Sequence, residues 1–237
     1  MSELRNIVIL TGAGISAESG LATFRGPDGV WEGHRVEDVA TPEAFVRDPG
    51  LVHSFYDARR SRLGEVEPND AHRALARLDD EWPGELLIVT QNVDDLHERA
   101  GAKRLLHMHG ELTGGLCMAC GSRFNWQGPM APGPNNNQCP RCGLFGQVRP
   151  DIVWFGEMPY EMERIDEALM NCDLFVSIGT SGAVYPAAGF VQTARYCGAR
   201  TLEINLEPSQ GSIFFDERRF GPAGVEVPKW VQEVLAS

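Results

Sequence analysis

Apolar runs of about five residues recur along the chain and alternate with longer amphipathic stretches. Runs of this length that are rich in Val, Ile and Leu are typical of strands buried on both faces of a sheet. The pattern predicts strands at residues 7–11, 86–90, 151–155, 174–178 and 201–205. Strands that alternate with helices favour an α/β fold, in which a doubly wound parallel sheet is covered by helices on both faces.

Amphipathic stretches between these runs predict the covering helices. They lie at residues 42–47, 51–63, 71–78, 94–100, 160–170, 187–197 and 229–235. Two regions interrupt the regular rhythm, a helical one from about residue 35 to 81 and a loop-rich one from about 113 to 149. We expect both to be insertions that pack beside the sheet.

Cysteine spacing gives the loop-rich region a chemical role. Four of the six cysteines form two C-x2-C pairs: Cys117, Cys120, Cys139 and Cys142. Two such pairs at this separation are typical of a zinc ion held in a tetrahedral shell of four thiolates. Four protein ligands leave no open position for water, so we predict one structural zinc ion that takes no part in chemistry. We expect the other two cysteines, Cys172 and Cys197, to be small buried side chains.

A glycine-rich loop directly follows the first predicted strand. Gly12, Gly14 and Ala17 satisfy the G-x-G-x-x-G/A pattern of dinucleotide-binding loops, in which the backbone approaches a pyrophosphate at a helix N-terminus. Alone, the pattern is equally typical of a simple turn. The acidic residue that usually follows about 20 positions later has no good counterpart, because Glu32 lies in an expected loop and Asp38 beside an expected helix start. The loop therefore favours nucleotide binding, but not of the usual dehydrogenase kind.

Together these patterns divide the chain into three parts. Residues 1–34, 82–112 and 150–237 form a Rossmann-like nucleotide-binding domain, residues 35–81 a helical insertion, and residues 113–149 a zinc-ribbon module. The two insertions make a smaller lobe, and we expect the ligand site in the cleft between the lobe and the sheet.

Charge and hydropathy narrow the classes of partner. The chain of 237 residues has 21 Lys and Arg against 33 Asp and Glu, a formal charge of -12. This charge disfavours nucleic acid and suits Lys-rich protein segments, although it also simply keeps a protein soluble. No apolar run approaches the roughly 20 residues that span a bilayer, and the N-terminal residues leave no room for a signal peptide. We expect a cytoplasmic protein without membrane contacts, and favour a monomer.

Several short motifs occur in the same order as in the sirtuin family of NAD-dependent protein deacylases, which the chain resembles over nearly its whole length. Besides the cysteine pairs, they are residues 12–16, 18–20, 23–26, 91–94, 107–110, 154–157, 179–181 and 205–207. The details resemble the class III branch, which holds many bacterial sirtuins and the mitochondrial desuccinylase. Val93, Ala22 and Thr23 depart from residues common elsewhere in the family, without putting NAD binding in doubt.

The resemblance implies a reaction. In the family, the carbonyl oxygen of an acyl-lysine attacks the nicotinamide ribose and expels nicotinamide. A histidine then acts as general base on a ribose hydroxyl, and the products are free lysine and O-acyl-ADP-ribose. The matching residue is His109, with Asn92 as a second catalytic residue. The residues alone do not separate His109 from His107, because an extended backbone puts both on one face.

The resemblance also implies how NAD is held. Asn92 and Asp94 would line its nicotinamide end, Gln91 would meet the ribose, and Glu207 would supply the missing acidic contact to the other ribose. A small polar residue at a strand end is also a common loop cap. The full set of expected NAD contacts is Gly12, Ala13, Gly14, Ile15, Ser16, Glu18, Thr23, Phe24, Arg25, Trp31, Gln91, Asn92, Val93, Asp94, Gly179, Thr180, Ser181, Asn205, Leu206, Glu207 and Ala223.

The resemblance implies that acyl specificity rests on Tyr56 and Arg59, which look like the Y-x-x-R motif of the class III branch. Three residues apart on a helix, they share a face, and a guanidinium with a phenol hydroxyl suits the free acid of succinyl- or malonyl-lysine. We expect desuccinylase and demalonylase activity beside deacetylase activity. The alternative is an ordinary amphipathic helix with a solvated Arg59. Further substrate contacts are expected at Val153, Phe155 and Gly156.

Two other functions are compatible with these motifs. Mono-ADP-ribosyl transfer uses the same departure of nicotinamide with a protein side chain as acceptor. A non-catalytic NAD-sensing zinc module needs no base, so His109 together with Gln91, Asn92 and Asp94 argues against it. Protein substrates and the preferred acyl chain cannot be read from the residues.

Overall fold

The computed structural model describes residues 4–22, 30–31, 33–130 and 137–236, with side chains omitted at 30 and 31. The expected NAD contacts Thr23, Phe24 and Arg25 lie outside the described residues, and only the backbone of Trp31 is placed. The main sheet has six parallel strands in the order β11-β10-β9-β1-β4-β5. Their bounds are Asn6–Thr11 (β1), Glu85–Thr90 (β4), Leu105–His107 (β5), Leu174–Ile178 (β9), Arg200–Asn205 (β10) and Glu217–Phe220 (β11). The order reverses between β1 and β9, so the expected doubly wound, Rossmann-like sheet is confirmed.

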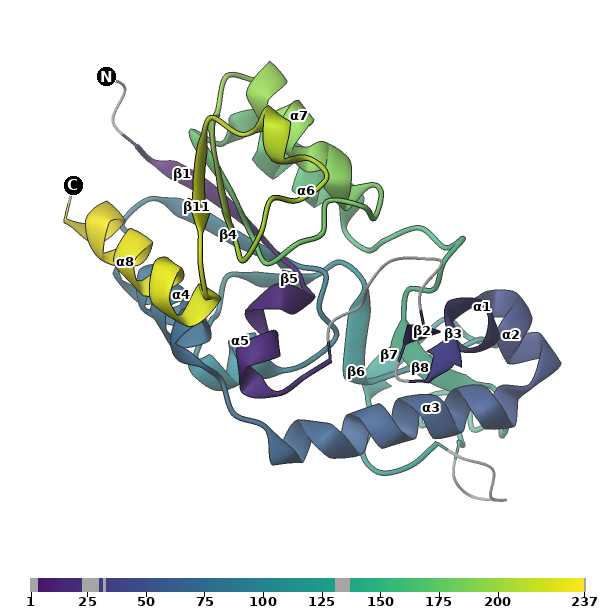
Figure 1. Ribbon diagram of the computed structural model, residues 1–237. Helices are drawn as coiled ribbons and strands as arrows, with labels where there is room; N and C mark the ends of the chain where they lie inside the picture. The colour runs from purple at the N-terminus through teal and green to yellow at the C-terminus, as the bar shows by residue number, and fades with distance from the viewer. Residues whose placement is uncertain (1–3, 23–29, 32, 131–136, 237) are drawn as a thin grey trace.

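Alternation along the strands explains why both faces are covered. Ile7 and Ile9 of β1 face a core layer shared with helices α4 (Asp70–Glu81) and α8 (Ala223–Leu235). Val8 and Leu10 face the opposite layer, shared with α6 (Met162–Asn171) and α7 (Phe190–Tyr196). Successive side chains of a strand point to opposite faces, so one apolar run fills both layers. Figure 1 shows these two helix pairs on either side of the sheet.

One predicted strand is wrong in place and partner. The run expected at 151–155 does not join the main sheet. Instead β8 (Val148–Ile152) pairs antiparallel with β6 (Gly110–Cys117), which also pairs with β7 (Arg123–Asn125). The apolar residues Val153 to Phe155 that suggested a strand follow β8 as loop. The reason lies in β8 itself, where Arg149 and Asp151 are buried in ion pairs that hydropathy does not reveal.

Two strands of the main sheet carry too weak a signal to be predicted. β5 has three residues, and β11 reads Glu-Arg-Arg-Phe with mostly exposed side chains because it pairs with one neighbour only. Both are edge strands, where a continuous apolar run is not required.

The predicted helices are confirmed, with shifted ends. α1 (Val36–Val39), α2 (Pro42–Arg47) and α3 (Pro49–Arg62) form the helical insertion, and α5 (Leu96–Ala100) follows β4. Thr41 and Asp48 cap α2 and α3 with their side chains, which explains the break between them. The last helix, α8, begins at Ala223 rather than 229, with Pro228 inside it. The short strands β2 (Val30–Trp31) and β3 (His34–Arg35) pair with each other.

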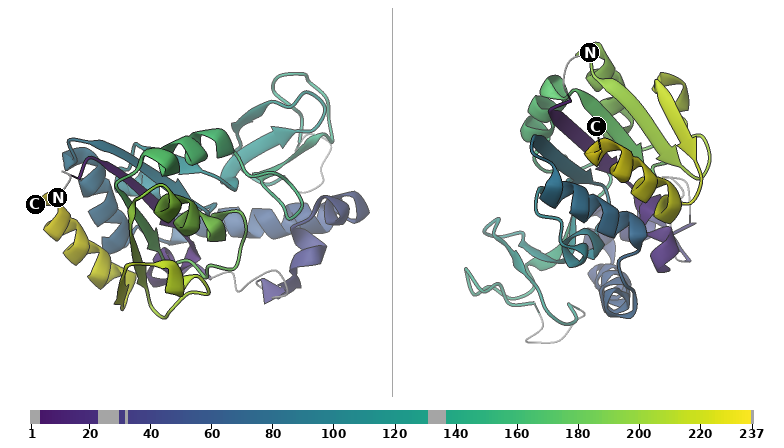
Figure 2. Two further views of the ribbon diagram at one scale, coloured as in Figure 1. Left: turned by 90° about the horizontal axis from the view of Figure 1, so that it is seen from above. Right: turned by 90° about the vertical axis from the view of Figure 1, so that its left-hand side faces the viewer.

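The two insertions lie together at one end of the main sheet (Figures 1 and 2). Residues of α1 to α3, including Val52 and Tyr56, share a core cluster with Leu112, Ile152 and Trp154 near β6 and β8. The division of the chain at 34, 81, 112 and 149 stays a prediction. None of the helices in the described ranges is both long enough and apolar enough to span a membrane.

Candidate active site

A cavity of about 1030 Å3 opens where β1, β4, β9 and β10 end, at the point where the strand order reverses. Doubly wound sheets bind ligands at this position. Tyr56 and Leu112 from the helical insertion and β6 close the opposite side, together with the loop after β8. The expected cleft between sheet and smaller lobe is therefore confirmed.

The glycines after β1 are required by a close approach of two backbones. A Cβ at Gly12 or Gly14 would lie 2.8 Å or 2.7 Å from the carbonyl oxygen of Gly179, which itself has φ +63°. The N–H of Gly14 donates to that oxygen at 2.8 Å. Two short 3₁₀ turns, Ala13–Ile15 and Ala17–Ser19, follow these glycines. The glycines thus pack the β1 loop onto the β9 loop at the floor of the cavity.

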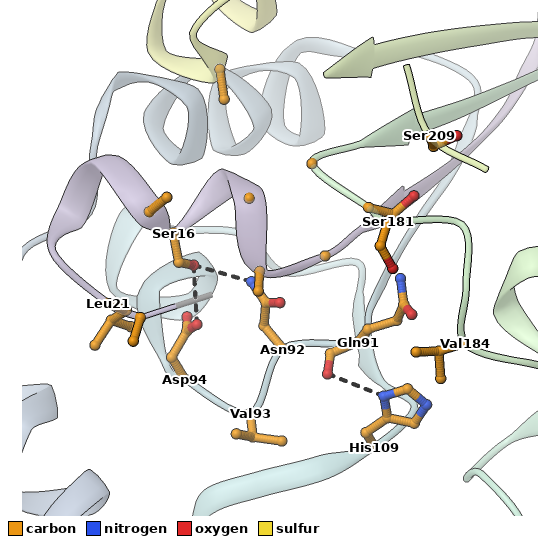
Figure 3. A pocket seen from close by; sticks show the side chains of 18 of the residues that line it. Ser16, Leu21, Gln91, Asn92, Val93, Asp94, His109, Ser181, Val184 and Ser209 are labelled. Carbon is orange, nitrogen blue, oxygen red and sulfur yellow. Dashed lines mark hydrogen bonds between the residues drawn. The ribbon is translucent and has the colours of Figure 1, made fainter. Parts of the chain in front are cut away.

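Ser16 connects the polar side chains at the centre of the cavity (Figure 3). Its Oγ accepts a hydrogen bond from Asn92 Nδ2 at 3.1 Å and donates one to Asp94 Oδ2 at 3.0 Å. His72 Nε2 lies 3.4 Å from the same oxygen, and its Nδ1 accepts the backbone N–H of Asn69. Burial raises the pKa of Asp94, although the Leu96 N–H and Ser16 oppose the rise.

His109 is fixed by one ring nitrogen and offers the other to the cavity. Its Nδ1 donates to the carbonyl oxygen of Gln91 at 3.2 Å, which leaves the lone pair on Nε2 (Figure 3). Burial lowers the pKa of His109, and the Gln91 bond offsets this only in part. The imidazole is therefore neutral near pH 7 and able to accept a proton.

Comparison with known proteins agrees with this geometry. The Sir2 family model matches residues 12–186, which span the glycine loop, the Gln91–Asp94 loop, His109 and all four paired cysteines. The chain belongs to the Sir2 family. Two curated relatives are an NAD-dependent protein deacylase of Bdellovibrio bacteriovorus, 57% identical over 98% of this chain and 97% of the relative, and the NAD-dependent protein deacylase SIR2rp3 of Leishmania major, 54% identical over 99% and 98%.

Solved structures of Sir2 proteins share the fold. A crystal structure of a Sir2 homolog–NAD complex superposes with a TM-score of 0.87 at 38% identity, covering 98% of this chain and 90% of that chain. A Sir2 complex with a p53 peptide and NAD+ has a TM-score of 0.78 at 26% identity, covering 99% and 93%.

The cavity of this Sir2 chain collects most of the expected contacts. Ile15 is the exception among the expected contacts whose side chains the structure describes, because its side chain is fully buried in the core. The expected contacts that line the cavity are Gly12, Ala13, Gly14, Ser16, Glu18, Tyr56, Arg59, Gln91, Asn92, Val93, Asp94, His109, Val153, Phe155, Gly156, Gly179, Thr180, Ser181, Asn205, Leu206, Glu207 and Ala223.

Several lining residues were missed by the sequence reasoning. Arg62 lines the cavity with Arg59, and the three-residue spacing on α3 was a signal for it. Ser209 and Gln210 also line it, and no sequence pattern pointed to them. Glu203, buried on β10, accepts hydrogen bonds from the Ser209 N–H at 3.0 Å and from the Ser212 hydroxyl, which holds this loop over the cavity.

The end of the cavity that α3 lines is built around an aromatic contact. Tyr56 is fully buried, and its hydroxyl accepts a hydrogen bond from Trp154 Nε1 at 3.0 Å. Burial raises the pKa of Tyr56, so the phenol stays neutral. Arg59 lines the cavity from the next turn of α3, and its guanidinium lies 5.7 Å from the Phe55 ring centroid. Tyr56 and Arg59 therefore do reach one cavity.

The four paired cysteines fit one zinc ion. Their sulfur atoms all lie within 4.8 Å of one another, and Cys117–Cys142 and Cys120–Cys139 are each 3.7 Å apart. A tetrahedron with Zn–S bonds of about 2.3 Å has S–S edges of about 3.8 Å. The same distances exclude disulfides, which need about 2.05 Å. None of the four cysteines lines the cavity, so this zinc is structural. Of the other two, Cys172 is buried as expected, but Cys197 is exposed because it follows the end of α7.

Proposed function

We propose that this chain is an NAD-dependent protein deacylase in which His109 is the general base and Asn92 with Asp94 binds the nicotinamide end of NAD. The observation that carries the proposal is the hydrogen bonding of the two ring nitrogens of His109. Its Nδ1 is bound to the Gln91 carbonyl, its Nε2 is free to accept a proton, and it shares one cavity with the Ser16, Asn92 and Asp94 cluster.

The residues present fit NAD. The cavity volume of about 1030 Å3 is at the upper end of the range for ligand sites and lies at the switch point of the sheet. Its floor is the glycine loop, and its walls carry amide, carboxylate and hydroxyl groups that can hydrogen-bond a carboxamide and two riboses. When bound, NAD supplies a bond to nicotinamide that leaves a cationic ribose carbon on cleavage, and a hydroxyl that accepts the acyl group.

The chain's own residues provide positioning, exclusion of water and proton transfer. The Asn92 carboxamide and the Asp94 carboxylate hold the nicotinamide end at fixed positions, because both are anchored on Ser16. Val153 and Phe155 line the acyl-lysine end with apolar surface and keep water from the reacting carbon. His109 Nε2 takes the proton from the ribose hydroxyl that attacks the acyl carbon.

The proposed acyl range includes acidic chains. Arg59 and Tyr56 both line the cavity, and Arg62 adds a second guanidinium from the same helix. A planar guanidinium suits the free carboxylate of a succinyl or malonyl group. We therefore extend the proposal to desuccinylation and demalonylation beside deacetylation, on acylated lysine in proteins. We also propose a cytoplasmic monomer that does not bind nucleic acid, in line with the six free cysteines and the charge of -12.

A mass-spectrometric assay tests the function directly. Purified protein is incubated with acetyl, malonyl and succinyl peptides of one sequence, with and without NAD. Deacylation predicts deacylated peptide, nicotinamide and O-acyl-ADP-ribose in equal amounts, and only with NAD. Protein or peptide that gains ADP-ribose while keeping its acyl group would show the transferase reaction instead. Absence of any NAD-dependent product would contradict both.

A further inference from the structure

A second histidine lies two residues before His109 and has no role in the proposed reaction. His107 ends β5, and its side chain is 8% exposed. His109 and His107 contact consecutive carbonyl groups of the loop after β4. His109 Nδ1 is bound to the Gln91 oxygen at 3.2 Å, and His107 Nδ1 to the Asn92 oxygen at 3.0 Å. The two imidazoles thus hold the same loop from one strand end.

Beside a carboxylate at Glu98, the contacts of His107 place a proton on each ring nitrogen. The Asn92 carbonyl oxygen can only accept, and Glu98 Oε1 of α5, another acceptor, lies 2.6 Å from Nε2. Burial by itself would lower the pKa of His107, but the hydrogen bond and charge of Glu98 outweigh it and the pKa is raised. Glu111 on β6 adds to the same effect. His107 is therefore favoured as an imidazolium beside a neutral His109.

A metal ion is the other group able to join these acceptors. Glu98, His107 and Glu111 have ligand atoms within 4.8 Å of one another. Two ligand atoms on one ion with bonds of about 2.1 Å stay roughly 3 Å apart or more. The 2.6 Å between Nε2 and Oε1 is shorter than this and has the length of a charge-assisted hydrogen bond. A shared proton between His107 and Glu98 therefore fits this distance better than a metal ion does.

The His107 contact completes the anchoring of Asn92. The Asn92 N–H donates to Thr90 Oγ1 at 3.0 Å, and its side-chain Nδ2 donates to Ser16 Oγ at 3.1 Å. The carbonyl is the remaining polar backbone group, and it belongs to the peptide that leads to Val93 and Asp94. The charge of His107 affects two nearby titratable groups. It lowers the pKa of Asp94, against the rise caused by burial, and it lowers the pKa of His97.

We propose that His107 is a positioning residue, whose imidazolium, held by Glu98, fixes the peptide between Asn92 and Val93 and thereby the groups that bind nicotinamide. The inference rests on the proposed function only where Asn92 and Asp94 are assigned to the nicotinamide end of NAD. Its effect should be confined to that end, because the residues expected to bind the other ribose, such as Glu207, follow β10 and line a different part of the cavity.

Direct binding of two ligands tests this without relying on catalysis. NAD and ADP-ribose differ by the nicotinamide group, so calorimetric Kd values for both separate the two ends of the cavity. His107→Leu should weaken NAD about tenfold to a hundredfold, the range for a lost hydrogen bond from a charged group, and leave ADP-ribose within about twofold. Glu98→Gln keeps an acceptor for Nε2 and removes the charge, so it should weaken NAD less than His107→Leu does.

Two matched neutral variants separate positioning from packing. An asparagine amide reaches the position of Nδ1, and a glutamine amide that of Nε2, so His107→Asn should retain NAD affinity better than His107→Gln. This comparison stands even if His107→Leu does not fold. Equal losses for NAD and ADP-ribose, or an asparagine variant no better than the glutamine one, would overturn the proposal. Failure of the deacylase function would instead appear as a wild-type protein that binds NAD without releasing nicotinamide.

Discussion

The zinc site and the cavity are organised in opposite ways. The zinc ligands come from two short turns within Cys117 to Cys142, and their spacing alone predicts the ion and its coordination. The cavity is lined by residues from Gly12 to Ala223, which only the strand order brings together. A local site can be read from spacing because few residues separate its ligands. A distributed site depends on how the whole sheet is assembled.

The two regions also differ in what they contribute. The zinc shell is closed and lies apart from the cavity, and β6 connects the two, because it runs from Gly110, next to the proposed base His109, to Cys117. The cavity holds the groups that act on a ligand. Removing the metal should therefore disturb the β6 wall of the cavity. Removing a cavity side chain should instead slow one step of the proposed reaction.

Zinc removal is expected to have the largest effect. Cys120→Ser should lose the metal and melt the sheet of β6, β7 and β8, because structural zinc sites contribute about 10–16 kcal/mol of apparent binding free energy. Activity should disappear with it. Zinc content, circular dichroism and limited proteolysis measure the change, with Cys197→Ser as the control because that cysteine is exposed and outside the cluster. A zinc-free protein with full activity would break the link between the two regions.

His109→Asn should give the largest purely chemical loss. General base catalysis contributes about a hundredfold to ten-thousandfold, so kcat/KM on an acetyl peptide should fall within that range. Zinc content and Tm should stay at wild-type values, because the imidazole makes one hydrogen bond at the cavity edge. His34→Gln is the control, since His34 does not line the cavity. Full activity in the asparagine variant would remove His109 as the base.

Arg59→Met should change selectivity rather than overall activity. Loss of a charge-assisted pair to the acyl carboxylate is expected to reduce kcat/KM on succinyl peptides about tenfold to a hundredfold, with little change on acetyl peptides. Arg73→Met, an exposed arginine on α4, is the matched control. An unchanged ratio of succinyl to acetyl rates would leave the acidic-acyl proposal without its main residue.

The smallest expected effect is on the pH dependence of the free energy of unfolding, and it comes from His72. Burial lowers the pKa of His72 to about 4, so from pH 6.5 downward the unfolded chain binds a proton that the folded chain does not. Stability should therefore fall as pH falls, by about 1 kcal/mol from this residue between pH 6.5 and 5.5. Urea unfolding at both pH values measures it.

His72→Gln should flatten that dependence, and His34→Gln should not. Protonation of the zinc ligands in acid also lowers the free energy of unfolding, but equally in both variants. The difference in pH dependence between the two variants therefore isolates His72. Equal slopes would mean that His72 is already charged in the folded protein.

Prediction from sequence succeeded where the residues of a short segment alone determine its structure. Strands β1, β4, β9 and β10 are apolar runs because both faces are covered, and the cysteine pairs carry their ligand geometry with them. It failed where a partner elsewhere decides the structure. The run at 151–155 looked like a strand of the main sheet. Arg123 and Glu157 pair with the charges of β8, which places residues 148–152 in the small sheet and leaves 153–155 as loop.

The sequence by itself determined the doubly wound sheet and the zinc ligands, because each depends on periodicity or spacing along the chain, whereas only the resemblance to the sirtuin family distinguished His109 from His107. Only the tertiary structure decided how those pieces act. It placed Gly12 and Gly14 against Gly179, anchored Asn92 and Asp94 on Ser16, and shifted the pKa of His109 down and that of His107 up. The physical reason is that burial and the groups facing each imidazole set its protonation, and these come from strands and helices distant in sequence.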